Sequence, residues 1–165
     1  MKAWNYQKGL LETGNGIYSY LQPDGSWGWS NAGLIVDGDQ SLLVDTLFDA
    51  PMTREMLAIM QDATGIRADQ IGTVVNTHAN GDHTHGNGLC THAEVIASEA
   101  GAKEMAAMGP EGLHLLMQRA PQMGDTGKYL LDIFGPFKFD DVAEKLPTQT
   151  FNGELQVMVG DKSLN

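Results

Sequence analysis

Residues 76–87 read NTHANGDHTHGN, and this stretch carries most of what the chain reveals about fold and function. Three histidines and one aspartate fall within eight of its positions, directly after the apolar residues 73–75 (TVV). Four of the five histidines of the chain lie in residues 78–92. A lone histidine is more often an ordinary polar loop residue, whereas this density after a buried strand pattern favours metal binding.

The spacing of the stretch predicts which side chains share an ion. Residues two apart in an extended segment project to the same side, so His78 and Asn80 can face one metal ion. Gly81 permits a sharp turn, which allows Asp82 and His83 to serve a second ion nearby. Imidazole nitrogen and carboxylate oxygen are donors that zinc, manganese and iron accept. The sequence therefore predicts a site for one or two ions, with zinc preferred and manganese or iron as alternatives.

Composition limits the remaining classes of function. A chain of 165 residues has the size of one ordinary domain, and its net charge of −11 argues against binding nucleic acid or an anionic membrane. Cys90 is the only cysteine, which excludes an internal disulfide and fits a reducing compartment. No apolar run is long enough for a signal peptide or a membrane span. We expect a soluble, cytoplasmic protein.

Strand and helix patterns alternate along the chain. Strand patterns occupy residues 16–22, 34–36, 42–44, 73–75 and 95–97. A helix is predicted from a cap at Asp49 to a stop at Gly65. Further helical patterns predict a helical insertion at residues 98–139, and Asn152-Gly153 predicts a hairpin turn before a strand at 155–159. We expect one α/β domain over residues 1–165, with a mixed sheet and covering helices.

These patterns carry a resemblance to a known family. Asp45-Thr46 after a strand, then a helix, a strand and Asn76-Thr77-His78-x-Asn80-x-Asp82-His83-x-x-Gly86-Asn87, resemble the metallo-β-lactamase superfamily, whose signature is H-x-H-x-D-H after a strand. Residues 30–35 (SNAGLI) are similar to the strand that many members place earlier in the chain. The resemblance implies half of a four-layer αββα sandwich for this chain.

The resemblance also implies roles for individual residues. His78 would be a ligand of a first metal site, and Asp82 and His83 would be ligands of a second, with Asp82 as the candidate catalytic residue. Asp45 would be a buried acid that supports the metal loop without binding metal. The implied activity is hydrolysis by a metal-bound hydroxide, on substrates that range in the family from lactams and thioesters to lactones and phosphodiesters.

Two features depart from the family pattern. Asn80 stands where the signature has its middle histidine, and its neutral amide oxygen is a poorer zinc donor than imidazole. The remaining ligands of the family come from later loops, yet no histidine follows His114. We therefore interpret the chain as the amino-terminal half of a larger enzyme, truncated at its carboxy-terminal side. Alone, it is expected to hold zinc weakly and to be inactive.

For three features the sequence leaves alternatives open. His85 either lines a substrate pocket or is a solvated loop histidine. The nearly continuous apolar strands fit a sheet that is covered on both faces, which predicts a homodimer or association with a carboxy-terminal fragment. The preferred function is a metal-dependent hydrolase for which this chain supplies the first half of the metal site. The alternative is a non-catalytic metal-binding or dimerising module that keeps half of the fold.

Overall fold

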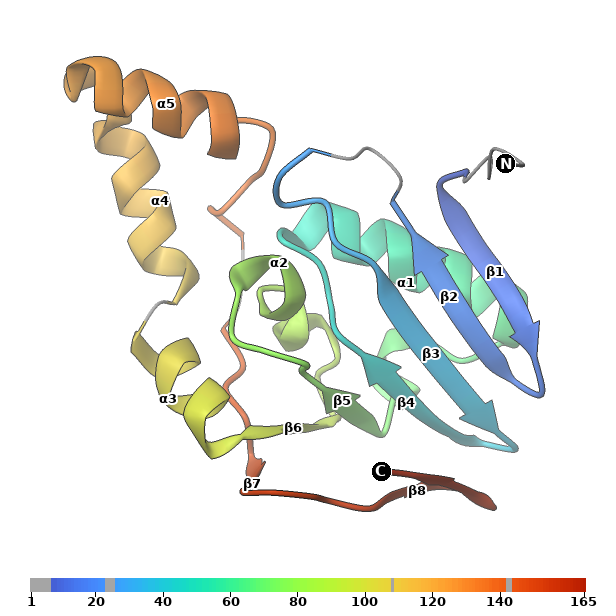
Figure 1. Ribbon diagram of the computed structural model, residues 1–165. Coiled ribbons are helices and arrows are strands. Elements are labelled where there is room, and N and C mark those ends of the chain that lie inside the picture. The colour runs from blue at the N-terminus through green and yellow to red at the C-terminus, as the bar shows by residue number, and fades with distance from the viewer. Residues whose placement is uncertain (1–6, 23–25, 108, 142–143) are drawn as a thin grey trace, which may run out of the picture.

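A seven-stranded mixed sheet organises the chain, as the computed structural model shows (Figure 1). The structure describes residues 7–22, 26–107, 109–141 and 144–165. In spatial order the strands are β1 (Gly9–Gly14), β2 (Ile17–Leu21), β3 (Ala32–Asp37), β4 (Gln40–Val44), β5 (Thr73–Val75), β6 (Glu94–Ser98) and β7 (Gln149–Phe151). Strands β1 to β4 pair antiparallel, whereas β4 to β7 pair parallel. The predicted α/β fold with a mixed sheet is confirmed.

The central strands determine where polar loop residues meet. Leu43, Val74 and Val95 lie side by side on β4, β5 and β6, and all three are fully buried. These strands are rich in apolar residues because both faces of a parallel sheet are usually covered. Neighbouring parallel strands end at the same edge of the sheet. The segments that follow β4 and β5 in the chain therefore begin next to each other.

Helix α1 (Ala50–Thr64) lies against one face of the sheet (Figure 1). Its first turn is capped by Asp49, whose side chain accepts a hydrogen bond of 2.8 Å from the Met52 amide. The helix ends at Gly65, which has a φ of 77° in the left-handed region. The predicted helix from Asp49 to Gly65 is confirmed.

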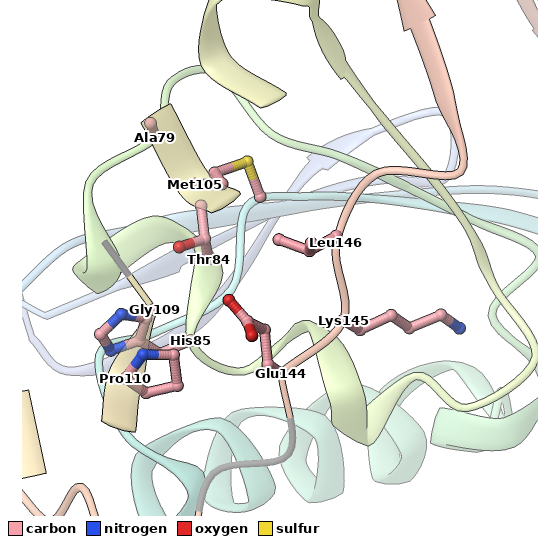
Figure 2. Close-up of a pocket in the computed structure, with 9 residues that line it drawn as sticks. All are labelled: Ala79, Thr84, His85, Met105, Gly109, Pro110, Glu144, Lys145 and Leu146. Atoms are coloured by element: carbon pink, nitrogen blue, oxygen red, sulfur yellow. The ribbon is translucent and has the colours of Figure 1, made fainter. Parts of the chain in front are cut away.

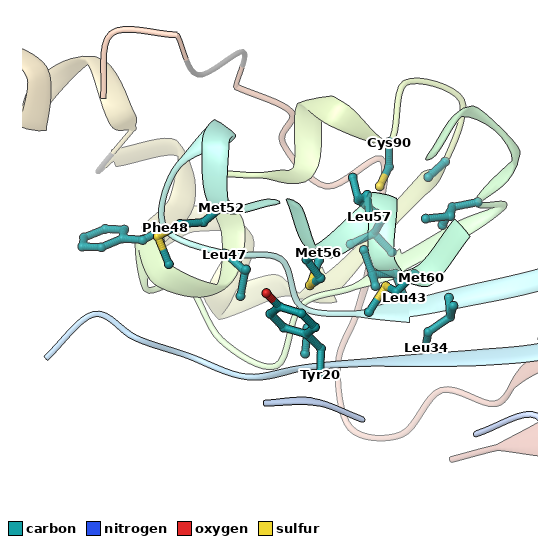
Figure 3. Packing of buried hydrophobic residues seen from close by; sticks show 14 of the residues in the cluster. Tyr20, Leu34, Leu43, Leu47, Phe48, Met52, Met56, Leu57, Met60 and Cys90 are labelled. Carbon is teal, nitrogen blue, oxygen red and sulfur yellow. The ribbon is translucent and has the colours of Figure 1, made fainter. Parts of the chain in front are cut away.

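Apolar side chains from the sheet and from α1 form the core (Figure 3). Tyr20, Leu43, Met56 and Met60 are each at most 1% exposed, and Phe48 is 2% exposed. Each fully buried side chain of this kind stabilises the fold by about 1.5–3 kcal/mol. The core thus holds the loop after β4 firmly against α1.

The other helices follow the parallel strands. The α-helices are α2 (Gly81–Thr84), α3 (Glu99–Ala107), α4 (Pro110–Arg119) and α5 (Gly124–Phe134), and the 3₁₀ helices are η1 (Ala68–Gln70), η2 (Asn87–Leu89) and η3 (Ala120–Gln122). Helices α4 and α5 form an arm that projects away from the sheet (Figure 1). Helices occur where the sequence predicted them within residues 98–139, of which residue 108 lies outside the described part. No helix among the described residues is both long and apolar enough to cross a lipid bilayer.

The tail corrects one expectation. Strand β7 pairs in parallel with β6 and does not turn back at Asn152-Gly153, so the predicted hairpin there is wrong. The hairpin instead joins β8 (Val157–Val159) to β9 (Lys162–Leu164). It is attached to the turn between β3 and β4, because Lys162 Nζ lies 2.9 Å from Asp37 Oδ1. The chain folds back at Gly160-Asp161, between β8 and β9, where Gly160 has a φ of 56° in the left-handed region.

Candidate metal site

The site lies where β4, β5 and β6 end together. The Asp45 amide, directly after β4, donates to the Val75 carbonyl across 2.9 Å. The Asn76 amide, directly after β5, donates to the Ile96 carbonyl across 2.9 Å. These two bonds continue the sheet one residue past its strands and bring the start of the loop at residues 76–87 beside Asp45.

Asp45 is the buried anchor of the loop. It is 4% exposed and has a φ of 61°, a conformation that aspartate adopts more readily than most residues. Its Oδ1 accepts from the Thr77 amide across 2.8 Å. Its Oδ2 accepts from the Thr77 hydroxyl across 2.7 Å and is 2.8 Å from His83 Nδ1. Hydrogen bonds to a carboxylate are stronger than neutral ones, so this side chain orients two residues of the loop at once.

His83 is oriented by its contact with Asp45. The ionised carboxylate accepts a hydrogen bond from Nδ1–H, which leaves Nε2 of the neutral ring with its lone pair. Nε2 lies 3.6 Å from Asp82 Oδ2. Burial lowers the pKa of His83, but the hydrogen bond to Asp45 and the charges of Asp45 and Asp82 together raise it above its ordinary value. The arrangement brings one nitrogen and one oxygen atom that can bind metal together on α2.

His78 and Asn80 are exposed on the outer side of the loop. The His78 ring centroid lies 4.2 Å from that of His83, with the planes at 53°. His78 Nδ1 is 2.9 Å from the Thr77 hydroxyl. Asn80 precedes α2 without a capping hydrogen bond from its side chain, and its carbonyl accepts from the His83 amide across 2.9 Å. That His78 and Asn80 face one ion stays a prediction.

A buried polar network holds the backbone of the loop. The His83 carbonyl accepts 2.9 Å hydrogen bonds from the Thr46 amide and from the Asn76 side chain. Asn87 donates to Asn76 Oδ1 across 2.8 Å, and its Oδ1 accepts from the Thr46 hydroxyl across 3.1 Å. Thr46 and Asn87 are fully buried. None of these three residues has a role that the sequence predicted, although Thr46 and Asn76 are polar residues shortly after the apolar strands β4 and β5, which is a usable signal.

Close packing explains the glycines of the loop. Gly81 begins α2 in ordinary helical geometry, and a side chain there would overlap the His85 ring and Phe48. Gly86 has a φ of −88°, and a side chain there would overlap Thr53. Glycine at these two positions is therefore favoured by the little space beside it, since neither residue has the positive φ that glycine adopts more readily than other residues.

Two further contacts place α2. The Ser30 hydroxyl donates a hydrogen bond to the Asp82 carbonyl. His85, at the end of α2, stacks on Phe48 with centroids 5.4 Å apart and is 7% exposed. Burial lowers the pKa of His85 to about 4, against smaller opposing effects of a hydrogen bond to the Phe48 backbone and the charge of Asp82. The alternative of a solvated loop histidine is therefore wrong for His85.

His85 lines a small pocket between α2 and the segment that follows the arm (Figure 2). Thr84, Met105 and Glu144 also line it. Its volume of about 20 Å³ accommodates about one water molecule. A role of His85 in substrate binding stays a prediction.

The donors fit zinc in kind but not in number. Imidazole and carboxylate are zinc ligands, and His83 presents its free nitrogen next to Asp82. Catalytic zinc usually has three protein ligands. Within the described part of the chain, no group of three or more histidine, cysteine, aspartate or glutamate side chains is arranged to hold a metal ion. The described residues could thus supply at most part of a zinc coordination shell.

The sequence model of the metallo-beta-lactamase superfamily matches residues 25–158, which include every candidate residue of the loop. A comparison with curated proteins finds none that matches the chain.

Solved structures show the same fold. A metallo-beta-lactamase from Pontibacter korlensis is 14% identical, with a TM-score of 0.59 over 95% of this chain and 58% of that one. TMB-1 is 17% identical, with a TM-score of 0.55 over 92% and 56%. FIM-1 from Pseudomonas aeruginosa, a metallo-beta-lactamase in its mono-zinc form, is 21% identical, with a TM-score of 0.50 over 59% and 45%. The chain therefore spans less than two thirds of the length of each of these structures.

Proposed function

The chain belongs to the metallo-β-lactamase superfamily, and on that premise we propose that it carries the first half of the metal site of a metal-dependent hydrolase. The observation that supports the proposal is the contact between Asp45 and His83, which leaves His83 Nε2 as a free donor 3.6 Å from Asp82 Oδ2. In metal sites, the ring nitrogen of a histidine that does not bind the ion typically donates a hydrogen bond to a carboxylate or carbonyl. This bond fixes the tautomer and the orientation of the ring.

The proposal assigns the donors as follows. His83 binds through Nε2 and Asp82 through its carboxylate, while His78 binds from the outer side of the loop. Asn80 offers a neutral oxygen, which makes its side of the site weaker for zinc. A bound ion supplies Lewis acidity toward a carbonyl or phosphoryl oxygen. We prefer zinc, in one or two ions, with manganese or iron as alternatives.

The residues of the chain have separate tasks in this proposal. Asp82 is the candidate catalytic residue, because its partly buried carboxylate lies 3.6 Å from the free nitrogen of His83. Asp45 orients His83 without binding metal. The substrate is a small molecule with a hydrolysable carbonyl or phosphoryl group, and His85 is the candidate to contact it.

Calorimetric titration of the metal-free chain with zinc tests the donor set. We expect weak binding, because the chain offers fewer well-placed donors than a three-ligand zinc site. His83→Ala and Asp82→Ala should each lower the affinity by at least about tenfold. His92→Ala is the matched control, since His92 is an exposed histidine outside the loop. Unchanged affinity in His83→Ala would contradict the proposal.

Asn80→His tests the weak side of the site. If Asn80 occupies a ligand position, an imidazole there raises zinc affinity, because it is the better donor. The exposed position of Asn80 leaves room for the larger ring. Affinity that is unchanged or lower in Asn80→His would show that the asparagine has another task.

The second candidate function is a non-catalytic metal-binding or dimerising module. The observation that favours it is that no three histidine, cysteine, aspartate or glutamate side chains among the described residues are grouped closely enough to hold one ion. Hydrolytic activity of the complete protein separates the two candidates, because only the hydrolase loses turnover in Asp82→Ala.

A partner for the sheet is part of the proposal. The face opposite α1 carries a groove of about 440 Å³. It is lined by apolar side chains of β3 to β6, such as Ile35, Val44 and Val75, and by the tail, including Val157 of β8 and Leu164 of β9. We propose that a second copy of the chain or a carboxy-terminal fragment packs there, since apolar sheet faces are normally covered. Sedimentation equilibrium at micromolar concentration should then give a mass above that of one chain. A stable monomer would contradict it.

A further inference from the structure

The Thr77 hydroxyl lies between a carboxylate and an imidazole. Its Oγ1 is 2.7 Å from Asp45 Oδ2 and 2.9 Å from His78 Nδ1. A hydroxyl has one proton to donate and two lone pairs that accept. Which neighbour receives that proton decides which nitrogen of His78 carries a hydrogen.

The carboxylate of Asp45 allows only one direction for the Thr77 hydroxyl proton. An ionised carboxylate only accepts hydrogen bonds, so the Thr77 hydroxyl must direct its proton to Asp45 Oδ2. The hydroxyl then faces His78 Nδ1 with a lone pair. The 2.9 Å contact between Thr77 Oγ1 and His78 Nδ1 is then a hydrogen bond only if Nδ1 carries a proton and donates it.

We propose that Thr77 is a positioning residue that transmits the charge of Asp45 to His78, and so holds this histidine as the Nδ1–H tautomer with Nε2 free. Asp45 imposes the same tautomer on His83 by direct contact. The buried carboxylate of Asp45 therefore determines the tautomer of two histidines. It acts on His78 through the Thr77 hydroxyl and on His83 by direct contact. The link to metal rests on the proposed function, because the free Nε2 atoms are the ones that would bind the ion.

The backbone makes Thr77 suited to this role. The Thr77 amide donates to Asp45 Oδ1 while its hydroxyl donates to Oδ2, so both carboxylate oxygens hold the same residue. The β-branched side chain also has few rotamers to choose from. His78 is exposed, and a neutral imidazole in water favours the opposite tautomer, so its state depends on this contact.

Nuclear magnetic resonance of the metal-free chain, labelled with ¹⁵N-histidine, tests the inference. At a pH where His78 is neutral, two-bond and three-bond ¹H–¹⁵N correlations distinguish a protonated from an unprotonated ring nitrogen. The signals are assigned by their loss in His78→Gln and His83→Gln. We expect His78 and His83 both to show protonated Nδ1 and unprotonated Nε2.

Two variants isolate the hydroxyl. Thr77→Val keeps the branched shape and the amide bond to Asp45, and it should shift the tautomer ratio of His78 by about threefold to tenfold toward Nε2–H. His83 should keep its tautomer, which also shows that the variant folds. Thr77→Ser restores a hydroxyl and should return His78 to Nδ1–H.

Two results would overturn the inference. One is protonated Nε2 on His78 in the unmodified chain, which needs no variant to observe. The other is a His78 tautomer that does not change in Thr77→Val. Because no metal is present, this experiment can fail while zinc titration succeeds, or the reverse, so the inference and the proposed function are tested separately.

Discussion

The loop at residues 76–87 has little regular secondary structure but is firmly attached to the core, whereas the arm of α4 and α5 is regular but has few buried residues. The loop contains only a single four-residue helix, yet Asn76, Thr84, His85 and Asn87 are buried in it. The arm consists of two regular helices, and the residues described as buried in them are only Pro110 in α4 and Gly127 in α5. Large side chains on the arm remain exposed, including Leu115, Tyr129 and Leu131.

The difference teaches that backbone hydrogen bonds within an element do not fix its position. The loop is held by hydrogen bonds to Asp45 and Thr46, which follow β4, and to the backbone of β6, whereas the arm mostly satisfies its own backbone. Regions with few buried contacts open locally at low free-energy cost. A site whose donors must stay within a fraction of an ångström needs the first kind of attachment.

The largest expected effect breaks the attachment of the loop. Asp45→Ala leaves the Thr77 amide, the Thr77 hydroxyl and His83 Nδ1 without their buried acceptor and should lower the free energy of unfolding by about 3 kcal/mol. Asp132→Ala on the exposed side of α5 is the control and should change stability by less than about 0.5 kcal/mol. Chemical denaturation measures both. Equal losses would show that loop and arm are attached alike.

Two glycines, one in the loop and one in the arm, allow the packing of the two regions to be compared. Gly86→Ala forces a methyl group against Thr53 and should cost about 1–3 kcal/mol. Gly112→Ala, within α4, meets nothing within 4 Å and should stabilise by about 0.5–1 kcal/mol because alanine favours the helix. The same denaturation measurement gives both values. Two effects of the same sign would contradict the contrast in packing.

The smallest expected effect concerns Cys90, a buried residue shortly after the loop, and reports whether water reaches its side chain. Burial raises the pKa of the Cys90 thiol to about 12, with a smaller opposing effect of Lys145. Above pH 9 the unfolded chain then loses this proton while the folded chain keeps it, so stability falls as pH rises. Between pH 8 and pH 10 the chain should lose about 1 kcal/mol relative to Cys90→Ala, in which this difference is absent.

The matched measurement follows the free energy of unfolding of both proteins at pH 8, 9 and 10. The variant corrects for every other group that titrates in this range. Parallel stability curves for the two proteins would mean that the folded chain ionises Cys90 as readily as the unfolded chain, and that water reaches this part of the core.

The sequence by itself determined the α/β class, the helix from Asp49 to Gly65, the central strands and the density of metal-type donors after β5. These features are local, because strand alternation, a capping side chain and a left-handed glycine act over a few residues. The family resemblance rested on the same short stretches, which is why it could be stated before any contact was known.

Only the tertiary structure decided what holds the donors in place. Thr46 and Asn87 are 41 positions apart, and Asp45 and His83 are 38 apart, so no local pattern announces their hydrogen bonds. The space that requires glycine at Gly86 is likewise set by Thr53 on α1. Chemical kinds of residue can be read along the chain, whereas the tautomer of a histidine and the room beside a glycine depend on which distant atoms the fold places next to them.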